Sequence, residues 1–155
     1  MAAPGLFDPL ALRGLRLLHR GWGAPMCQYS VRPQDGAGVP NDWHLMHLGQ
    51  FAAGGAALIL TEATAVNAVG RISPRDTGLW TDGQAGAWSR IVRFVHEYGA
   101  AEAKIGVQLA HAGRKASTYW PFAPLRGSVG PAEGGWQTVA PTSDPFDGYA
   151  EPAAL

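Results

Sequence analysis

Residues 41–63, NDWHLMHLGQFAAGGAALILTEA, contain a predicted helix followed by a predicted strand, and this pair determines the class of fold. Asn41 or Asp42 can cap a helix that begins near Trp43. Residues at spacings of three and four share one face of this helix: Trp43, Met46, His47, Gln50, Phe51 and Gly54. The unbroken apolar run over 56–60 predicts a short buried strand, as in a parallel sheet covered on both sides.

The same pattern recurs farther along the chain. A loop over 64–83, rich in Gly, Pro, Asp and Asn, precedes a second helix predicted from about Gln84 to Tyr98, with Gly99 as its C-cap. The apolar side of this helix consists of Ala87, Trp88, Ile91, Val92, Val95 and Tyr98. The apolar pattern of residues 104–109 predicts a further strand. The many Gly and Pro residues over 110–145 predict a long loop with a hairpin.

A first strand before residue 24 gives the order strand–helix–strand–helix–strand. Crossovers of this length between the strands predict an α/β fold with a parallel sheet. The chain supplies about three strands, and both edges of such a sheet would be open. Finished domains rarely leave two edges open. We therefore expect either a truncated chain or one that assembles with another chain.

The composition limits the classes of function. The chain has 155 residues, is 46% hydrophobic and has zero formal net charge, which removes the main electrostatic argument for nucleic-acid or anionic-membrane binding. The single cysteine, Cys27, excludes an internal disulfide framework and fits a reducing, cytoplasmic setting. We expect a soluble protein, because the N-terminus lacks the pattern of a signal peptide and the most apolar run, 51–60, is far shorter than the roughly 20 residues of a membrane span.

Polar and reactive residues follow three predicted strands, in segments 24–29, 61–63 and 108–115. Ligands of parallel α/β folds bind at the carboxyl ends of the strands, so the pattern predicts one shared pocket. The alternative is that strand ends become polar simply because they reach water. No dinucleotide-binding glycine motif or P-loop is present in the sequence.

Three readings of Cys27 remain open from its position alone. A lone cysteine is most often a small buried hydrophobe. As a nucleophile it would need a nearby base, for which His44, His47 and His111 are the candidates. With His44 and His47 it could also form a metal site, although two histidines three apart on a helix are more often structural.

Gln108 stands out because it interrupts an otherwise apolar strand. A buried amide is costly unless paired, so its partner is either neighbouring backbone or a ligand edge with alternating donors and acceptors, as in a flavin or a nucleobase. In the following loop, His111, Arg114 and Lys115 concentrate positive charge, which could hold a phosphate or simply be solvated.

Long motifs of this chain resemble the Old Yellow Enzyme family, in particular its bacterial thermophilic-like branch with a cysteine in the first motif. The motifs are LFDPLALRGLRL from Leu6, PMCQYS from Pro25, WHLMHLGQFAAGGAALILTEATAV from Trp43, GRISPRDTGLW from Gly70 and IGVQLAHAGRKAS from Ile105. The resemblance implies a (β/α)8 TIM barrel, of which residues 1–155 would be the N-terminal part, a truncated single FMN-binding domain with about three βα units. It implies an NADPH dehydrogenase, or ene-reductase, in which FMN is reduced by NADPH or NADH and an activated alkene is the substrate.

The resemblance also implies roles for individual residues. Ala24, Pro25, Met26, Cys27 and Ala63 would line the flavin, with Cys27 tuning its redox potential, and Gln108 would hydrogen-bond its pyrimidine ring. Tyr29 would reach over the substrate, while the basic loop after Gln108 would shape the surroundings. A non-catalytic barrel fragment, which binds FMN weakly or acts as an interaction module, is the alternative, and a homo-oligomer is compatible with both.

Two segments depart from the family pattern. Residues 19–23, HRGWG, replace the usual Asn-Arg and apolar strand, and their glycines predict a weak strand. Residues 101–103 form an apparent three-residue insertion before the strand at 104–109.

Overall fold

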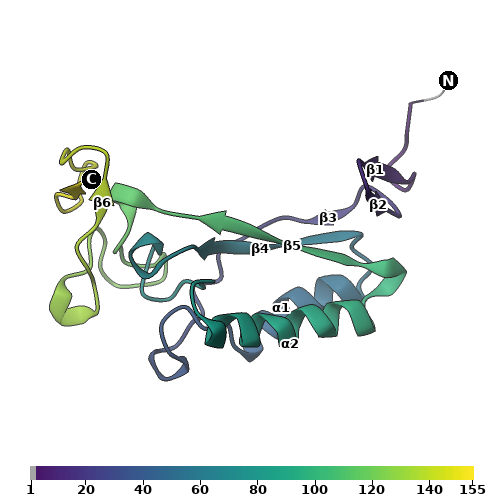
Figure 1. The fold of residues 1–155 in the computed structure, drawn as a ribbon, viewed down its shortest axis with the longest axis horizontal. Helices are drawn as coiled ribbons and strands as arrows, with labels where there is room; N and C mark the ends of the chain where they lie inside the picture. Colours follow the sequence, from purple (N-terminus) through teal and green to yellow (C-terminus); the bar gives the residue numbers. More distant parts are fainter. Residues whose placement is uncertain (1–2) are drawn as a thin grey trace.

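A three-stranded parallel sheet forms one layer and two helices form the other (Figure 1). The computed structural model describes residues 3–155. The sheet has the order β3 (Trp22–Gly23), β4 (Leu58–Ala65) and β5 (Lys104–Ala110), and the helices are α1 (Asp42–Ala53) and α2 (Asp82–Tyr98). The predicted α/β fold with parallel strands is confirmed.

The predicted cap of α1 is confirmed, and α2 begins with a cap of the same kind. The Asn41 side chain accepts a hydrogen bond from the Trp43 amide at 3.0 Å, and Thr81 likewise accepts one from the Gln84 amide at 3.3 Å. Each contact satisfies an amide that has no partner within the first turn of its helix. Helix α2 begins two residues before the predicted Gln84, and Gly99 is its C-cap.

The face of α1 that the three-and-four spacing defines is not its buried face. Trp43, Met46 and Phe51 remain 49%, 47% and 39% exposed. The buried side consists of His44, Leu48, Gly49 and Ala52. Gly49 permits close packing of the helices, because a Cβ there would lie 2.7 Å from the Phe94 ring.

The main core lies between the helices and the sheet. Its buried members are Leu48, Ala52, Ile59, Trp88, Ile91, Val95 and Ala103. Tyr98, which the periodicity assigns to the apolar side of α2, is 60% exposed because it lies in the last turn, beyond this core. A smaller cluster of Leu17, Ala57 and Leu58 lies beneath an antiparallel hairpin, β1 (Leu10–Leu12) and β2 (Leu15–Leu17), that the sequence analysis missed.

Strand β4 is longer than the predicted 56–60 and contains a bulge. Its pairing with β5 passes from Leu60↔Gly106 to Ala63↔Gln108, so β4 has one extra residue in this interval. Regular alternation would place Glu62 on the face of Leu60. The extra residue allows Thr61 and Glu62 both to be buried, and it re-aims the side chains that follow.

The two departures from the family pattern have simple structural outcomes. Strand β3 has only two residues, as the glycines of 19–23 predict. The apparent insertion at 101–103 lies in the turn η3 (Ala100–Glu102) and the residue after it. Both changes are therefore absorbed outside the regular part of β5.

The segment after β5 is mostly irregular, as predicted. It contains one antiparallel bridge, Thr118↔Ser128, and a short parallel pair, β6 (Val139–Ala140) and β7 (Ala153–Ala154). The remaining short turns are η1 (Pro33–Asp35), η2 (Ala68–Gly70), η4 (Gly113–Lys115) and η5 (Pro131–Glu133). Among the helices of residues 3–155, none is both long enough and apolar enough to cross a membrane.

Two arginines fasten this irregular segment to the loop after β4. The guanidinium of Arg71 lies 4.4 Å from the centre of the Trp136 ring, and that of Arg75 lies 4.2 Å from the centre of the Trp120 ring. The Trp136 indole N–H also donates to the Val69 carbonyl at 2.9 Å. The irregular segment after β5 therefore packs over the loop of residues 68–76.

Candidate functional site

The carboxyl edge of the sheet brings three predicted site residues into neighbouring positions. Ala63 on β4 pairs with Gln108 on β5, and the Cys27 sulfur lies beside the backbone amide of Ala63. The three residues therefore form a row across adjacent chain segments, in the order Cys27, Ala63 and Gln108. None is fully buried. Ala24 and Met26 are exposed and Pro25 is half-buried in the segment that leads to Cys27.

The prediction that Gln108 is a buried amide is wrong. Its residue is exposed, because β5 is an edge of the described sheet. Within residues 3–155 its backbone amide donates to Thr61 Oγ1 at 3.3 Å, whereas its side-chain amide has no hydrogen-bond partner. The side chain therefore offers two donors and an acceptor at the open edge.

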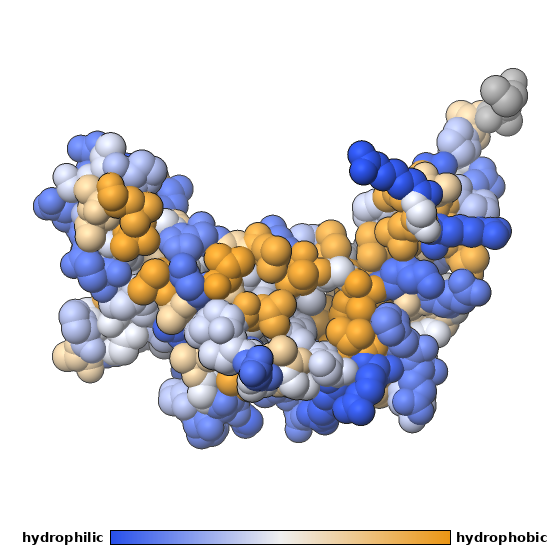
Figure 2. All heavy atoms as spheres, in the orientation of Figure 1, coloured by the Kyte–Doolittle hydropathy of each residue, from blue (hydrophilic) through white to orange (hydrophobic). Residues whose placement is uncertain are grey.

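This edge has the chemistry of a surface for a planar heteroaromatic ring. Hydrophobic residues gather across the middle of the molecule between its two raised ends (Figure 2). Met26 is 63% exposed in the segment that leads to Cys27. Val107 and Leu109 of β5 are also exposed, but alternation along the strand places them on the face opposite Gln108, and Val107 lines a hollow with Trp88 and Val92 of α2. Met26 and the Gln108 amide together offer an apolar contact and a set of donors and acceptors, which suits the ring of FMN.

A buried pair of His44 and Glu62 supports this edge from behind, and the sequence analysis did not anticipate it. His44 Nε2 lies 3.0 Å from Glu62 Oε1, and each side chain is 2% exposed. The contact is within ion-pair distance, although its angle is not that of an aligned hydrogen bond. Glu62 Oε2 accepts the Gln28 backbone amide at 2.5 Å, so this carboxylate holds the segment after β3 that carries Cys27.

The ring nitrogens of His44 have separate partners. His44 Nδ1 lies 3.0 Å from both the backbone amide and the side-chain oxygen of Asn41, whereas Nε2 faces Glu62. The same imidazole therefore takes part in the capping contact of α1 and faces the buried Glu62 carboxylate. His44 is a structural residue in this arrangement.

The Cys27 thiol has carboxyl groups rather than an imidazole beside it. Burial, followed by the charges of Asp76 and Glu62, raises the pKa of the thiol, while hydrogen bonds from the Ala63 amide and the Tyr29 hydroxyl lower it. A nucleophilic cysteine needs the opposite environment. The hypothesis of a Cys–His nucleophile is therefore unsupported, and the predicted metal set of Cys27, His44 and His47 is not brought together.

The other two candidate histidines have different surroundings. His47 is half-buried on α1, where burial lowers its pKa and its ring packs edge-on against Phe51. His111 is exposed, and its Nδ1 accepts the Gly113 amide at 3.1 Å. Neither is among the groups that influence the Cys27 thiol.

Asp76 is a further site residue that the sequence analysis missed. Its side chain lies in the loop after β4, is 1% exposed, and accepts the Ser73 amide through Oδ2. Among residues 3–155 its other oxygen has no hydrogen-bond partner. Burial, with a smaller contribution from Glu62, raises the pKa of Asp76 to about 7 against the opposing effects of Ser73 and Arg71.

The raised pKa of Asp76 predicts that this residue destabilises the fold at alkaline pH. The value rises from 3.8 to about 7 on folding, so its contribution to stability is fully present below pH 3.8 and is lost as the pH rises through 7. We expect the free energy of unfolding of the wild type, minus that of Asp76→Asn, to be larger at pH 5 than at pH 8. Urea unfolding at both pH values checks this, with the exposed Asp147→Asn as control. A difference that does not change with pH would contradict the assignment.

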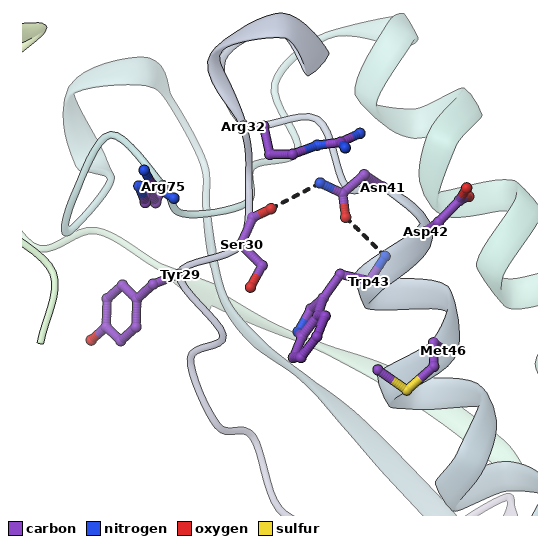
Figure 3. Close-up of a pocket in the computed structure, with 8 residues that line it drawn as sticks. All are labelled: Tyr29, Ser30, Arg32, Asn41, Asp42, Trp43, Met46 and Arg75. Carbon is purple, nitrogen blue, oxygen red and sulfur yellow. Dashed lines mark hydrogen bonds between the residues drawn. The ribbon is translucent and has the colours of Figure 1, made fainter. Parts of the chain in front are cut away.

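Tyr29 has a strained backbone and lies between two hollows. Its φ of +51° is in the left-handed region, which is rare for an aromatic residue. One hollow, of about 550 Å³, lies toward Trp43 and Met46 of α1, and Figure 3 shows Tyr29 and Trp43 on opposite sides of Ser30. The other, of about 650 Å³, lies toward the segment that contains Tyr119. Burial, together with the neighbouring Cys27, raises the pKa of the Tyr29 phenol to about 12.

The basic residues after β5 contact the C-terminal segment. Arg114 donates to the Asp144 carbonyl at 2.7 Å and to Thr142 Oγ1 at 3.0 Å, and the Lys115 ammonium lies 3.8 Å from the centre of the Phe146 ring. These groups hold the irregular segment against the strand end. His111 and Arg114 also line an open hollow with Pro141 and Leu155.

Comparison with known proteins gives consistent matches. The model of the NADH:flavin oxidoreductase / NADH oxidase family matches residues 5–145. An NADPH dehydrogenase of Listeria monocytogenes is 44% identical over 142 residues, which is 92% of this chain and 36% of that protein. An NADH:flavin oxidoreductase of Gibberella zeae is 43% identical over 140 residues, 89% of this chain and 32% of that protein. The chain thus spans about a third of the length of these curated relatives.

Solved structures of two proteins share the fold of almost the whole chain. Morphinone reductase, solved in complex with tetrahydroNAD, is 29% identical with a TM-score of 0.76, and the match covers 99% of this chain and 41% of that one. An old yellow enzyme homologue from Zymomonas mobilis is 29% identical with a TM-score of 0.75, covering 98% and 40%. The parallel βα units described above match the N-terminal part of their TIM barrel.

Proposed function

Since the chain belongs to the NADH:flavin oxidoreductase / NADH oxidase family, that of the Old Yellow Enzymes, we propose that it provides the first part of an FMN-dependent NAD(P)H oxidoreductase that reduces activated alkenes. The observation that carries this proposal is the row of Cys27, Ala63 and Gln108 at the carboxyl edge of the sheet. When bound there, FMN would supply the transfer of hydride from NADPH or NADH to an α,β-unsaturated carbonyl compound.

Each residue of the edge has a role that its surroundings support. The half-buried Pro25 and the exposed Met26 exclude water from the face of the ring. Gln108 would hold and orient the pyrimidine edge through its free amide, whose donors would stabilise negative charge at that edge. Tyr29 keeps its proton at neutral pH because its pKa is raised to about 12, so its hydroxyl could donate to a substrate carbonyl in place of the Cys27 sulfur.

FMN binding by the purified chain tests the proposal. FMN fluorescence is titrated with the chain, and the visible spectrum is then recorded after desalting. We expect saturable quenching and a retained flavin band that NADPH bleaches under anaerobic conditions. Absence of quenching would contradict the proposal for this chain and would favour a role without flavin.

Gln108→Ala is expected to weaken FMN binding by about tenfold, since loss of one or two hydrogen bonds to a ring edge costs about 1–1.5 kcal/mol. The same fluorescence titration measures the dissociation constant. Gln50→Ala is the matched control, because Gln50 is an exposed amide on α1 and lies away from the sheet edge. Equal affinities of wild type and Gln108→Ala would refute the assigned role of this amide.

A second candidate is a non-catalytic interaction module, and the exposed hydrophobic face of α1 favours it. Trp43, Met46 and Phe51 on that face are all more than one-third exposed. Contiguous exposed apolar surface often marks an interface, including one between copies of the same chain. Concentration-dependent association in light scattering, without any flavin binding, would favour this candidate.

A further inference from the structure

Three segments bring one thiol and two carboxyl groups together behind the flavin-facing edge. Cys27 comes from the segment after β3, Glu62 from the bulge of β4, and Asp76 from the loop that follows β4. One ligand-type atom of each residue lies within 4.8 Å of those of the other two. Glu62 and Asp76 are 3% and 1% exposed, whereas Cys27 is half-buried and reachable from solvent.

The two carboxyl groups have different partners. Glu62 faces His44 through one oxygen and the Gln28 amide through the other. Asp76 has Ser73 on one oxygen only, and the other oxygen has no partner among the described residues. The other charged or titratable groups around Asp76 are Arg71, Tyr29 and the thiol itself. A buried, half-satisfied carboxyl beside a thiol requires an explanation, because such a group is costly.

The effect of this arrangement is to oppose ionisation of Cys27. Burial is the largest cause of the raised pKa of the thiol, and both carboxyl groups add to it. Asp76 itself ionises at about pH 7, below the ordinary thiol value of about 8.5. The carboxyl therefore becomes fully charged before the thiol would lose its proton, so repulsion is complete in the pH range where thiolate would form.

Cysteine in such a position faces a chemical hazard if the substrate is an activated alkene. A thiolate sulfur adds to the β-carbon of the alkene, so that a C–S bond forms, the C=C π bond breaks, and a proton from water ends on the α-carbon. No oxidant or reductant takes part. The reaction needs the thiolate, since the neutral thiol is a poor nucleophile.

We propose that Glu62 and Asp76, whose carboxyl oxygens lie within 4.8 Å of the Cys27 sulfur, protect Cys27 from alkylation by activated alkenes. The identity of the alkene as substrate rests on the proposed function, whereas the protective effect rests on the positions of the two carboxyl groups beside the thiol and on the direction in which they shift its pKa. Asp76 is thus a positioning residue that acts through Cys27 and does not touch the substrate.

The single cysteine makes the test direct. The 155-residue chain is treated with N-ethylmaleimide, an activated alkene, in EDTA between pH 6 and 10, and the rate of alkylation of Cys27 is followed by mass spectrometry. For the wild type we expect the midpoint of the pH profile to lie above the ordinary thiol value of about 8.5. Thiolate absorbance near 240 nm, recorded over the same pH range, gives the midpoint independently of access to the reagent.

Asp76→Asn should lower this midpoint and speed alkylation at pH 8. Each unit of lowered pKa raises the thiolate fraction about tenfold, and the lower nucleophilicity of a more acidic thiol reduces the gain in rate to about threefold. Glu62→Gln should act in the same direction, and Asp147→Asn, which removes an exposed carboxyl, should leave the profile unchanged. A change in access alone would alter the plateau rate but not the midpoint.

Two results would overturn the proposal: a wild-type midpoint at or below the ordinary thiol value, or a midpoint unchanged in both Asp76→Asn and Glu62→Gln. The first requires no variant, so the test holds even if a variant fails to fold. Flavin takes no part in the reaction. An ordinary midpoint for the thiol together with intact FMN binding would refute only this inference. A raised midpoint without FMN binding would refute only the proposed function.

Discussion

His44→Ala is expected to lower the free energy of unfolding by about 1–3 kcal/mol, because the buried Glu62 carboxyl then loses the polar group that faces it. The partner is Glu62, whose Oε1 lies 3.0 Å from His44 Nε2 in a region where both side chains are 2% exposed. The substitution also removes the acceptor of the Asn41 amide at the start of α1. One change therefore weakens a helix cap and the strand end that carries the site.

Urea unfolding followed by circular dichroism measures this loss. His47→Ala is the control, because His47 is on the same helix, is only half-buried, and has no carboxylate partner among the described residues. Its substitution should change the free energy of unfolding by less than about 1 kcal/mol. Similar losses for the two variants would mean that the His44–Glu62 contact contributes little to stability.

Trp88→Ala is expected to destabilise the fold by about 3–5 kcal/mol, the usual cost of removing a large aromatic residue from a core. Trp88 is 7% exposed and packs in the cluster between the helices and the sheet. Its indole N–H donates to the Gly78 carbonyl at 3.0 Å, a hydrogen bond that fixes the end of the loop containing Asp76. Loss of that donor leaves the carbonyl without its partner, which adds to the cost of the cavity.

Thermal and urea unfolding of Trp88→Ala are compared with those of Trp43→Ala. The control residue is also a helical tryptophan, but it is 49% exposed and donates only to the Gln28 side chain. Trp43→Ala should lower the free energy of unfolding by no more than about 1 kcal/mol. We expect the Trp88 variant also to react faster with N-ethylmaleimide, since the loop that carries Asp76 loses an anchor. Equal stability of the two variants would contradict the position of Trp88 in the core.

Much of the fold was predictable because its signals are local. Asn41 and Thr81 cap helices through contacts within three residues, and the spacing of Trp88, Ile91 and Val95 gives α2 its buried side. Alternation along the sequence could not predict the bulge in β4. The extra residue becomes apparent only in the pairing of β4 with β5, a strand more than forty residues later. Likewise, no local pattern indicates which face of α1 meets α2.

The candidate site shows the same division. The order of the motifs around Cys27, Ala63 and Gln108 was sufficient to indicate the family, and the carboxyl ends of parallel strands necessarily bring such segments to one edge. The exposure of Gln108 was predicted wrongly, since burial depends on what lies beside β5 rather than on the apolar residues around it in sequence.

The sequence by itself determined the helices, the parallel strands, the α/β class and the family, because capping, periodicity and motif order are all properties of neighbouring residues. The tertiary structure alone decided that Glu62 turns inward to His44 and that Asp76 lies beside Cys27. Those contacts join residues far apart in the chain, and their energies depend on burial. Burial exists only once the helices, the sheet and the covering loop have packed together.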